Sequence, residues 1–234
     1  MRLWLTRTAP EADASAGRLR AQGHEVLVAP ALQVVALGGG PLDISDAGAV
    51  AFTSSNGVRA FAARTAARAL PAFAVGRATA QAALDAGFAQ VTSAEGGVAE
   101  LAALILAGPP PRGAVLHAAP RDPAGDLVGR LAAAGVPARS LVLYATEPGP
   151  TPAEVLEALS ARPPALDAVL VYSARAAQEL AASPELAAAA PSLELIAISA
   201  AAAAPLRRLN FRRVAVAALP NEPALLTLTA TRRD

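Results

Sequence analysis

The feature that most limits how this chain can fold is a pattern that occurs twice, in its middle and in its C-terminal part. The apolar run 50–54 ends in hydroxyl-bearing residues, the run 169–173 repeats that order, and a helical pattern follows each run. Further along, Gly87 in the first copy and Asn210 in the second take the same place. Both residue types tolerate the left-handed backbone conformation after a helix. The repeat therefore predicts two similar α/β units, with a cleft between them where a ligand can lie.

Short apolar segments alternate with helical segments in both copies, which is typical of a parallel sheet covered on both faces. The segments predicted in the first copy are 50–53, 56–68, 72–75, 78–86, 91–92, 98–106, 114–117 and 125–134. In the second copy we predict strands 168–172, 195–198 and 214–217, a helix at 152–160, and further helices from Ala174, ending at Leu209 and from Pro223. These are too few strands for a full sheet, so the N-terminal strands 3–6 and 24–28 are expected to join them.

This strand count predicts a discontinuous first domain, residues 1–36 plus 148–234, and an inserted second domain, residues 43–138. The extended segments 32–38 and 139–147 are expected to pair as a two-stranded β linker. The predicted fold class is α/β, with two similar parallel-sheet domains of the flavodoxin-like kind and an active site in the interdomain cleft.

The composition excludes several kinds of chemistry. The chain has no cysteine, and all 20 of its basic residues are arginine. Without lysine or cysteine it cannot form a Schiff base, use a thiol nucleophile or hold a thiolate metal site. Its two histidines, His24 and His117, lie far apart without metal-ligand spacing, and His24, in a turn beside Gly23, is expected at the surface. We therefore expect no metal catalysis, although carboxylates alone could hold a loosely bound Mg²⁺.

The distribution of charge and hydropathy predicts a cytoplasmic protein. The formal net charge of +1 is spread evenly, which argues against a nucleic-acid partner. No apolar run approaches the roughly 18 residues of a membrane span, and the N-terminal segment is too short and too charged for a secretory signal. We expect a monomer that binds a small molecule, with neither nucleic acid nor membrane as a partner.

Chemistry is expected at the carboxyl ends of the strands, where open parallel sheets bind ligands and helix N-termini present unpaired amides. The residues there are rich in hydroxyls and free N–H groups, which suit an anionic ligand. The substrate-binding candidates are Arg7, Ser54, Ser55, Asn56, Arg77, Thr79, His117, Ser173 and Ser199. Helix capping is the alternative role for most of the hydroxyl-bearing candidates and for Asn56. A solvated surface position is the alternative for Arg77, and a structural position for His117.

The two tyrosines are assigned different roles. Tyr144 stands in the predicted linker segment 139–147, so its phenol can point into the gap between the domains. The alternative is that Tyr144 is an aromatic packing anchor. Tyr172 belongs to a predicted strand and is expected in the core.

On these residues, the sequence resembles the uroporphyrinogen-III synthase family over nearly its full length. The matching features, in chain order, are Thr6-Arg7, Pro30, 52–58, 75–80, Gly135, 144–146, 172–174 and 218–226. Their order and spacing together carry the resemblance. It implies two α/β domains joined by a two-stranded ladder, with one domain built from both chain ends.

The resemblance also implies an activity. The family's enzyme, a hydro-lyase of heme, chlorophyll and cobalamin biosynthesis, takes hydroxymethylbilane, a linear tetrapyrrole polycarboxylate. It expels water and closes the macrocycle with inversion of ring D, and it needs no cofactor or metal. By resemblance, Tyr144 stands where the family has a tyrosine proposed to assist departure of the hydroxyl, and Thr79 where it has a threonine facing the cleft. The segment 199–202 lacks the family's usual hydroxyls except for Ser199.

Two other classes of protein stay open. A non-catalytic two-lobed binding module for an anionic small molecule would have the same architecture and would not catalyse a reaction. A pair of receiver-like or nucleotide-binding regulatory domains would need an acidic cluster with a lysine, or a Gly-x-Gly-x-x-Gly turn after the first strand. The sequence contains neither of these.

Overall fold

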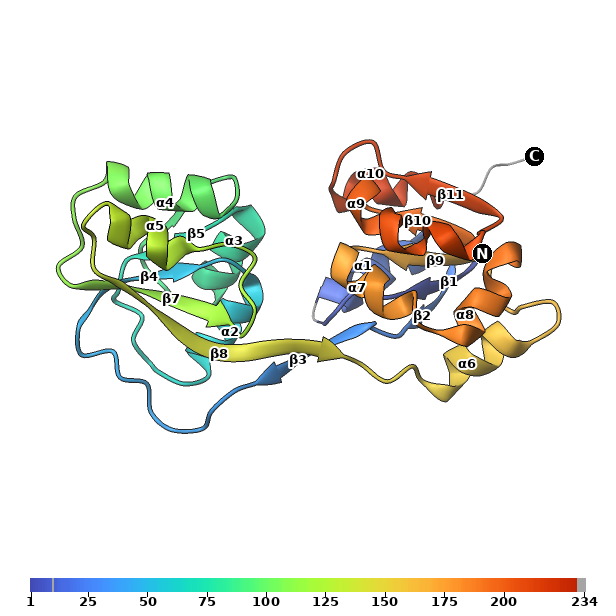
Figure 1. Ribbon diagram of the computed structural model, residues 1–234, viewed down its shortest axis with the longest axis horizontal. Coiled ribbons are helices and arrows are strands. Elements are labelled where there is room, and N and C mark those ends of the chain that lie inside the picture. Colours follow the sequence, from blue (N-terminus) through green and yellow to red (C-terminus); the bar gives the residue numbers. More distant parts are fainter. Residues whose placement is uncertain (10, 231–234) are drawn as a thin grey trace. The chain divides into compact units, whose positions relative to one another are not determined.

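The computed structural model describes residues 1–9 and 11–230, and the chain divides into two compact units. Unit 1 consists of Met1–Gln33 and Glu147–Asp234, and unit 2 of Val34–Thr146. The chain therefore leaves unit 1, forms unit 2 and returns, as the colours of Figure 1 follow. Each unit is an α/β sandwich around its own sheet.

Unit 1 is built on a five-stranded parallel sheet in the order β11-β10-β9-β1-β2. Its strands are β1 (Arg2–Leu5), β2 (Glu25–Val28), β9 (Ala168–Val171), β10 (Glu194–Ala197) and β11 (Arg213–Val216). The N-terminal strands complete the sheet, because β1 pairs with β9 and places Leu5 opposite Leu170. All four residues of β9 are buried, which matches its continuous apolar run.

Helices cover both faces of this sheet (Figure 1). One face is covered by α1 (Glu11–Ala21) and α10 (Glu222–Leu226), the other by α6 (Ala153–Ser160), α7 (Ala174–Leu180), α8 (Pro184–Ala189), α9 (Ala200–Ala203) and the 3-10 segments η1 (Ala190–Ser192) and η2 (Ala204–Leu209). Successive residues of β1 serve the two cores in turn, since Leu3 and Leu5 pack on the α1 side and Trp4 on the other.

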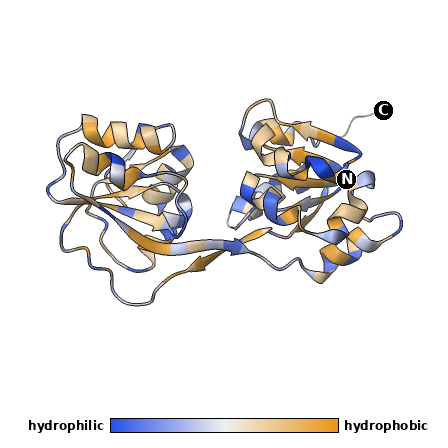
Figure 2. Cartoon of the chain, viewed as in Figure 1, coloured by the Kyte–Doolittle hydropathy of each residue, from blue (hydrophilic) through white to orange (hydrophobic). Residues whose placement is uncertain are grey.

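Unit 2 supplies β4 to β7 and most of β8 in the second sheet, which is six-stranded in the order β3-β8-β7-β4-β5-β6. The strands are β3 (Leu32–Ala36), β4 (Ala47–Phe52), β5 (Ala72–Ala74), β6 (Val91–Ser93), β7 (Ala114–Pro120) and β8 (Ala138–Pro148). The strands from β4 to β8 run parallel. One face is covered by α2 (Ser55–Ala62) and α3 (Arg77–Asp85), the other by α4 (Val98–Ala107) and α5 (Leu127–Ala133). Figure 2 shows the hydrophobic strands of both units.

The two units share one spatial plan but not one chain order. In unit 2, β4, β5 and β6 are neighbours, and β7 and then β8 lie on the other side of β4. In unit 1, β9, β10 and β11 repeat that arrangement, while the N-terminal strands β1 and β2 take the places of β7 and β8. The predicted fold class, two similar parallel-sheet α/β domains, is confirmed; the two-stranded linker stays a prediction. Ligand sites are expected beside β4 and β7 in unit 2 and beside β9 and β1 in unit 1, where the strand order reverses.

Two helices are followed by residues with a left-handed backbone conformation, as the repeat predicted. Gly87, after α3, has φ 94°, and Asn210, after η2, has φ 54°. Gly57 has a different role, because a Cβ on it would lie 2.5 Å from the carbonyl oxygen of Ala118. Only glycine lets α2 approach β7 this closely, so Gly57 sets where the start of α2 lies relative to the end of β7.

The expectation that His24 lies at the surface is wrong. Its side chain is 5% exposed, and its backbone N–H donates to the Leu19 carbonyl at 3.2 Å. Burial and the amino group of Met1 lower its pKa, whereas a backbone contact with Thr229 raises it. The local turn was identified correctly, but the C-terminal segment that covers it lies about two hundred residues away in sequence and left no local signal.

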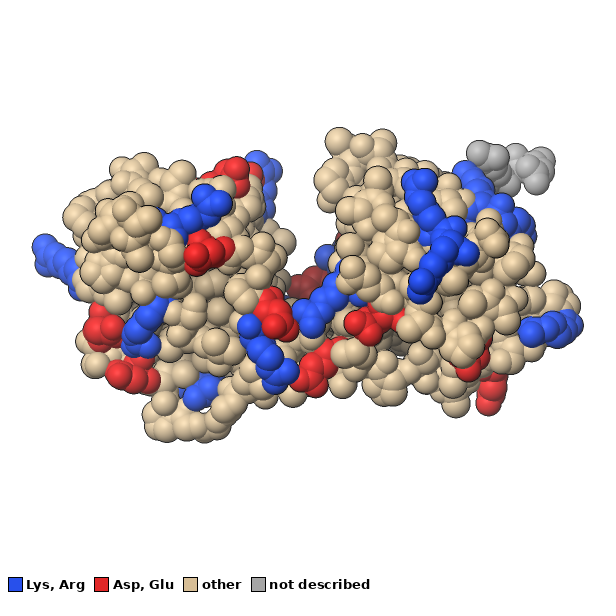
Figure 3. All heavy atoms as spheres, in the orientation of Figure 1, with Lys and Arg blue, Asp and Glu red and all other residues tan. Residues whose placement is uncertain are grey.

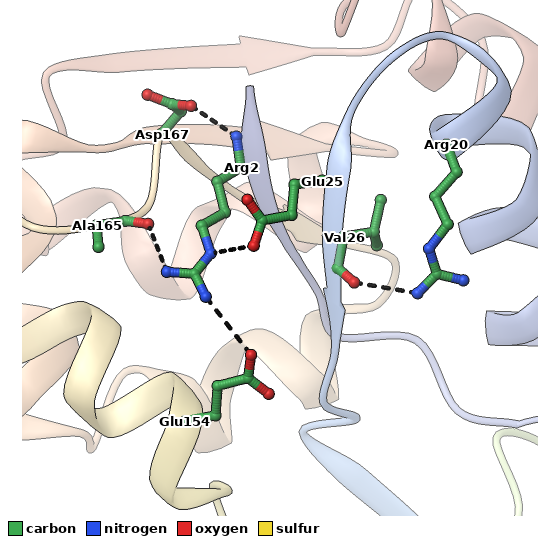
Figure 4. A network of polar contacts seen from close by, with 7 residues as sticks. All are labelled: Arg2, Arg20, Glu25, Val26, Glu154, Ala165 and Asp167. Carbon is green, nitrogen blue, oxygen red and sulfur yellow. Dashed lines mark hydrogen bonds and ion pairs between the residues drawn. The ribbon is translucent and has the colours of Figure 1, made fainter.

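Ion pairs close the amino-terminal edge of the unit 1 sheet (Figure 4). The backbone N–H of Arg2 donates to Asp167 Oδ2 at 2.6 Å, and its guanidinium pairs with Glu25 at 2.7 Å and Glu154 at 3.5 Å. These contacts join β1 to β2, to α6 and to the segment before β9. Elsewhere, basic and acidic side chains are interspersed over the face of each unit drawn in Figure 3.

Candidate functional site

A cavity of about 480 Å³ lies in unit 2, at the carboxyl ends of β4 and β7 where the strand order reverses. Its polar lining residues include Thr53, Ser54, Asn56, His117, Asp122 and Tyr144. Four of the predicted site residues are among them: Ser54, Asn56, His117 and Tyr144. These residues come from three segments that are far apart in sequence and that adjacent parallel strands bring to one edge of the sheet.

The first turn of α2 supplies two of these residues. Ser54 caps the helix, because its side chain accepts a hydrogen bond from the backbone N–H of Asn56 at 3.1 Å. The Asn56 side-chain oxygen accepts from Arg59 Nη2 at 2.5 Å. Ser55 is the first residue of the helix, so neither it nor Asn56 is the cap. Among the three candidates of this segment, the capping alternative therefore holds for Ser54 only, and Ser54 also lines the cavity.

Tyr144 comes from β8 and is 3% exposed, within the core cluster that includes Leu143. Burial raises the pKa of its phenol, while a hydrogen bond with Ser54 and the charge of Arg59 act in the opposite direction. The phenol is therefore protonated at neutral pH and lies beside the Ser54 hydroxyl at the cavity wall. Tyr144 is a packing residue and a cavity residue at once.

His117 comes from β7 and is 2% exposed. Its Nε2 lies 3.0 Å from Oγ1 of Thr53, the residue that follows β4. Burial lowers the pKa of His117 to about 4, so the imidazole is neutral at pH 7. Among the residues that line the cavity, Asp122 is the only aspartate or glutamate, and none is an arginine. The cavity is polar through hydroxyl groups rather than through cations.

Two candidates from α3 lie outside this cavity. The Arg77 side chain is 87% exposed and pairs with Glu95 at 2.7 Å, in agreement with the solvated alternative. Thr79 is 6% exposed and is the third residue of the helix, whose N-cap is Gly76. Thr79 is therefore not a helix cap, because the helix begins earlier than predicted.

In unit 1, Arg7 follows β1 at the edge where β1 and β9 meet. Its Nη1 lies 3.2 Å from Ser15 Oγ and 3.4 Å from Glu222 Oε2, and its guanidinium lies over the Tyr172 ring at 4.9 Å. Tyr172 is half-buried against the core, as expected. Burial and the Glu222 carboxylate raise the pKa of Tyr172 to about 12. Arg7 is thus held by an acidic partner, a hydroxyl and an aromatic face.

The remaining candidates, Ser173 and Ser199, each cap a helix of unit 1. Ser173 caps α7 by accepting from the Ala176 N–H at 3.1 Å, and Ser199 caps α9 by accepting from the Ala202 N–H at 3.2 Å. Each cap satisfies one first-turn amide of its helix.

Sequence reasoning missed several residues of the unit 2 cavity, namely Gly96, Gly97, Asp122 and Thr146. All of them lie in segments after β6, after β7 or within β8, at the same end of the sheet as the residues that were predicted. Applying the strand-end rule to every strand, including the linker segment, would have found them.

A family model described as uroporphyrinogen-III synthase HemD matches residues 13–227. The chain belongs to the uroporphyrinogen-III synthase family. The resemblance predicted from sequence is thereby confirmed, and the protein is an enzyme of tetrapyrrole synthesis.

Solved structures of this family share the fold. The uroporphyrinogen-III synthetase of Helicobacter pylori is similar with a TM-score of 0.65 and 18% identity, over 98% of this chain and 98% of that chain. A mutant uroporphyrinogen III synthase of Thermus thermophilus is similar with a TM-score of 0.55 and 18% identity, over 98% of this chain and 97% of that one. At such identities the similarity shows the fold alone. None of the curated proteins matches the sequence.

Two properties can be stated for the described part of this synthase-family chain. Residues 1–9 and 11–230 contain no group of three or more His, Asp or Glu placed to hold a metal ion. In the same residues, every helix is too short or too polar to cross a membrane.

Proposed function

We propose that the protein is a hydro-lyase that cyclises hydroxymethylbilane to uroporphyrinogen III, with loss of water and inversion of ring D. The observation that carries this proposal is the family match over residues 13–227. The alternative of a non-catalytic binding module is not favoured, because that match is to an enzyme family.

The chemistry proposed for the family needs little acid–base power from the protein. When the C–O bond of the hydroxymethyl group breaks, the pyrrole nitrogen supplies electrons to the carbon, and the departing oxygen takes a proton to leave as water. The harder task is to hold a flexible polyanion in the one conformation that leads to the inverted product. We assign the proton donor to Tyr144, whose phenol is protonated at neutral pH and lies at the cavity wall beside Ser54.

The substrate carboxylates require a different set of groups. We propose that they bind to Arg7 and Arg77 and to first-turn amides at the helix N-termini. These amides belong to the helices that start at Arg77, Ala174 and Ala200. Ser54, Ser55, Asn56, Thr79, His117, Ser173 and Ser199 are proposed to support substrate binding through their hydroxyl, amide or imidazole groups.

The remaining features of the proposal follow from the reaction and from the composition. Loss of water leaves the oxidation state of the substrate unchanged, so the proposed step needs no redox cofactor. We propose a cytoplasmic monomer, which agrees with the absence of cysteine from the sequence and with its net charge of +1. Nucleic acid is not a proposed partner.

The proposal is tested by the isomer that the protein makes. Purified protein is given freshly prepared hydroxymethylbilane in the presence of EDTA, and the products are oxidised to porphyrins and separated by chromatography. We expect mainly the type III isomer, formed faster than the spontaneous reaction. Type I product at the uncatalysed rate would contradict the proposal, and loss of type III product only with EDTA would contradict its metal-free form.

A further inference from the structure

His117 occupies an unusual position in unit 2, between two cavities. The first is the cavity of about 480 Å³ that Thr53 and Tyr144 line, and the second, of about 460 Å³, is lined by Asp126 and Ser140. His117 contributes to both and is 2% exposed. Its strand pairs on both sides, with Ala51 of β4 and Ser140 of β8 opposite His117. Pairing on both sides holds the backbone of His117 in place.

The contact that His117 makes is with a single hydroxyl. Its Nε2 lies 3.0 Å from Thr53 Oγ1, at the start of the segment that leads into α2. Depending on the neutral tautomer, Nε2 either donates a hydrogen bond to the Thr53 hydroxyl or accepts one from it. The hydroxyl then offers its complementary hydrogen bond to a group in the first cavity. The hydroxyl of Thr53 is thus oriented before any ligand arrives.

No arginine is among the residues that line the first cavity. Tyr144 of β8 and Asp122 from the segment after β7 line the first cavity, and Asp126 from the same segment lines the second. Arg59 of α2 affects the pKa of Tyr144 but does not line the first cavity, and its Nη2 donates to the side-chain oxygen of Asn56. Burial accounts for the lowered pKa of His117.

An ionised carboxylate that enters this cavity loses its hydration and meets no arginine side chain in the lining, which is costly. By contrast, a pyrrole N–H and a hydroxymethyl O–H are neutral groups that hydroxyl, imidazole and carboxylate side chains satisfy by hydrogen bonds.

We propose that His117 is a positioning residue: its imidazole orients the Thr53 hydroxyl, so that the unit 2 cavity receives the uncharged hydroxymethyl end of the substrate rather than one of its carboxylates. This inference rests on the proposed function, and it places the reacting end of the tetrapyrrole next to Tyr144. The substrate carboxylates are then held by other groups. Consequently, the Thr53–His117 pair contributes to kcat rather than to the affinity for the polyanion.

The test compares three variants in steady-state assays with hydroxymethylbilane. His117→Phe removes the hydrogen bond and keeps a ring, and we expect kcat to fall about tenfold with KM within about twofold of wild type. His117→Gln keeps a group that can reach Thr53, and we expect it to recover most of the lost kcat. The control is His24→Phe, the same substitution at the other buried histidine, which lies in unit 1. We expect its kcat and KM to equal those of the wild type.

A KM that rises while kcat is unchanged in His117→Phe would overturn the proposal, because it would mean that the cavity binds a carboxylate. Equal losses in His117→Gln and His117→Phe would also overturn it. If His117→Phe does not fold, Thr53→Val tests the same bond from the other side. Thr53→Val should then lower kcat about tenfold with KM within about twofold of wild type. The double variant with His117→Gln should lose no more than Thr53→Val alone, and additive losses would contradict the pairing.

These outcomes are separable from a failure of the proposed function, which would appear as a wild-type protein that makes no type III isomer. In that case there would be no wild-type activity with which to compare the variants.

Discussion

Replacing Gly57 with alanine tests whether the close approach of α2 to β7 builds the site. The new Cβ would lie 2.5 Å from the carbonyl oxygen of Ala118, a backbone atom of a central strand that has no freedom to move alone. An ordinary carbon–oxygen contact is about 3.3 Å, so α2 must move outward by about 0.8 Å. That movement displaces Ser54 and Asn56 at the start of the helix.

The free-energy change has two parts. Overpacking of this kind costs about 1–3 kcal/mol, whereas alanine in a helix is favoured over glycine by about 0.5–1 kcal/mol. Gly17, inside α1, separates the two parts, because a Cβ there meets no atom within 4 Å. Gly17→Ala therefore gains the helix term alone. The two variants should differ in free energy of unfolding by about 1–3 kcal/mol, with Gly57→Ala the less stable.

Urea unfolding of both variants, followed by circular dichroism, measures this difference, and steady-state assays with hydroxymethylbilane measure the effect on the site. We expect kcat of Gly57→Ala to fall by about ten- to a hundredfold, since a displacement near 1 Å is enough for a loss of that size. Gly17→Ala should keep the wild-type kcat. If Gly57→Ala proves as stable and as active as Gly17→Ala, the helix is not held by this contact and the reasoning is refuted.

Three further predictions concern other contacts. Tyr144→Phe should lower kcat by about ten- to a hundredfold while the affinity for uroporphyrinogen III, measured by equilibrium binding, stays close to wild type; an unchanged kcat would leave Tyr144 a packing role only. Arg2→Ala should lower the free energy of urea unfolding by about 1 kcal/mol, more than Arg77→Ala at the exposed pair with Glu95. Equal losses would show that the Arg2 contacts of Figure 4 add no more stability than an exposed pair. The folded state favours the neutral forms of His24 and His117, so the stability that they contribute is present above the ordinary pKa of 6.5 and is lost as the pH falls toward 4. Protonation of His117 alone should lower the free energy of unfolding by about 2 kcal/mol at pH 5. A His117→Gln variant with an unchanged pH dependence would contradict this.

The sequence predicted the strands and most helices because their signals are local. Apolar runs mark the buried strands, and Gly87 and Asn210 mark helix ends that require a left-handed residue. The helix predicted from Ala174 is shorter than its alanine-rich sequence suggests, since Ser183 and Pro184 begin a new helix. That pair is a recognised N-cap and first-turn signal and was available in the sequence.

Other features depend on contacts that no local pattern contains. His24 is buried because distant segments, including the one around Thr229, cover it. The pairing of His117 with Thr53 joins two strand ends that the rule for parallel sheets brings to one edge, but the rule does not say which side chains meet. Likewise, the sequence indicated that Arg7 could bind an anion, whereas its existing partner Glu222 is supplied by α10, at the far end of the chain.

The most direct test of the account is the isomer composition of the product over a time course at several concentrations of wild-type protein. The account predicts that the rate of type III formation rises in proportion to protein concentration, while type I formation falls as the common substrate is consumed. A type III fraction that does not change with protein concentration would contradict the claim that this chain directs the closure of the tetrapyrrole ring.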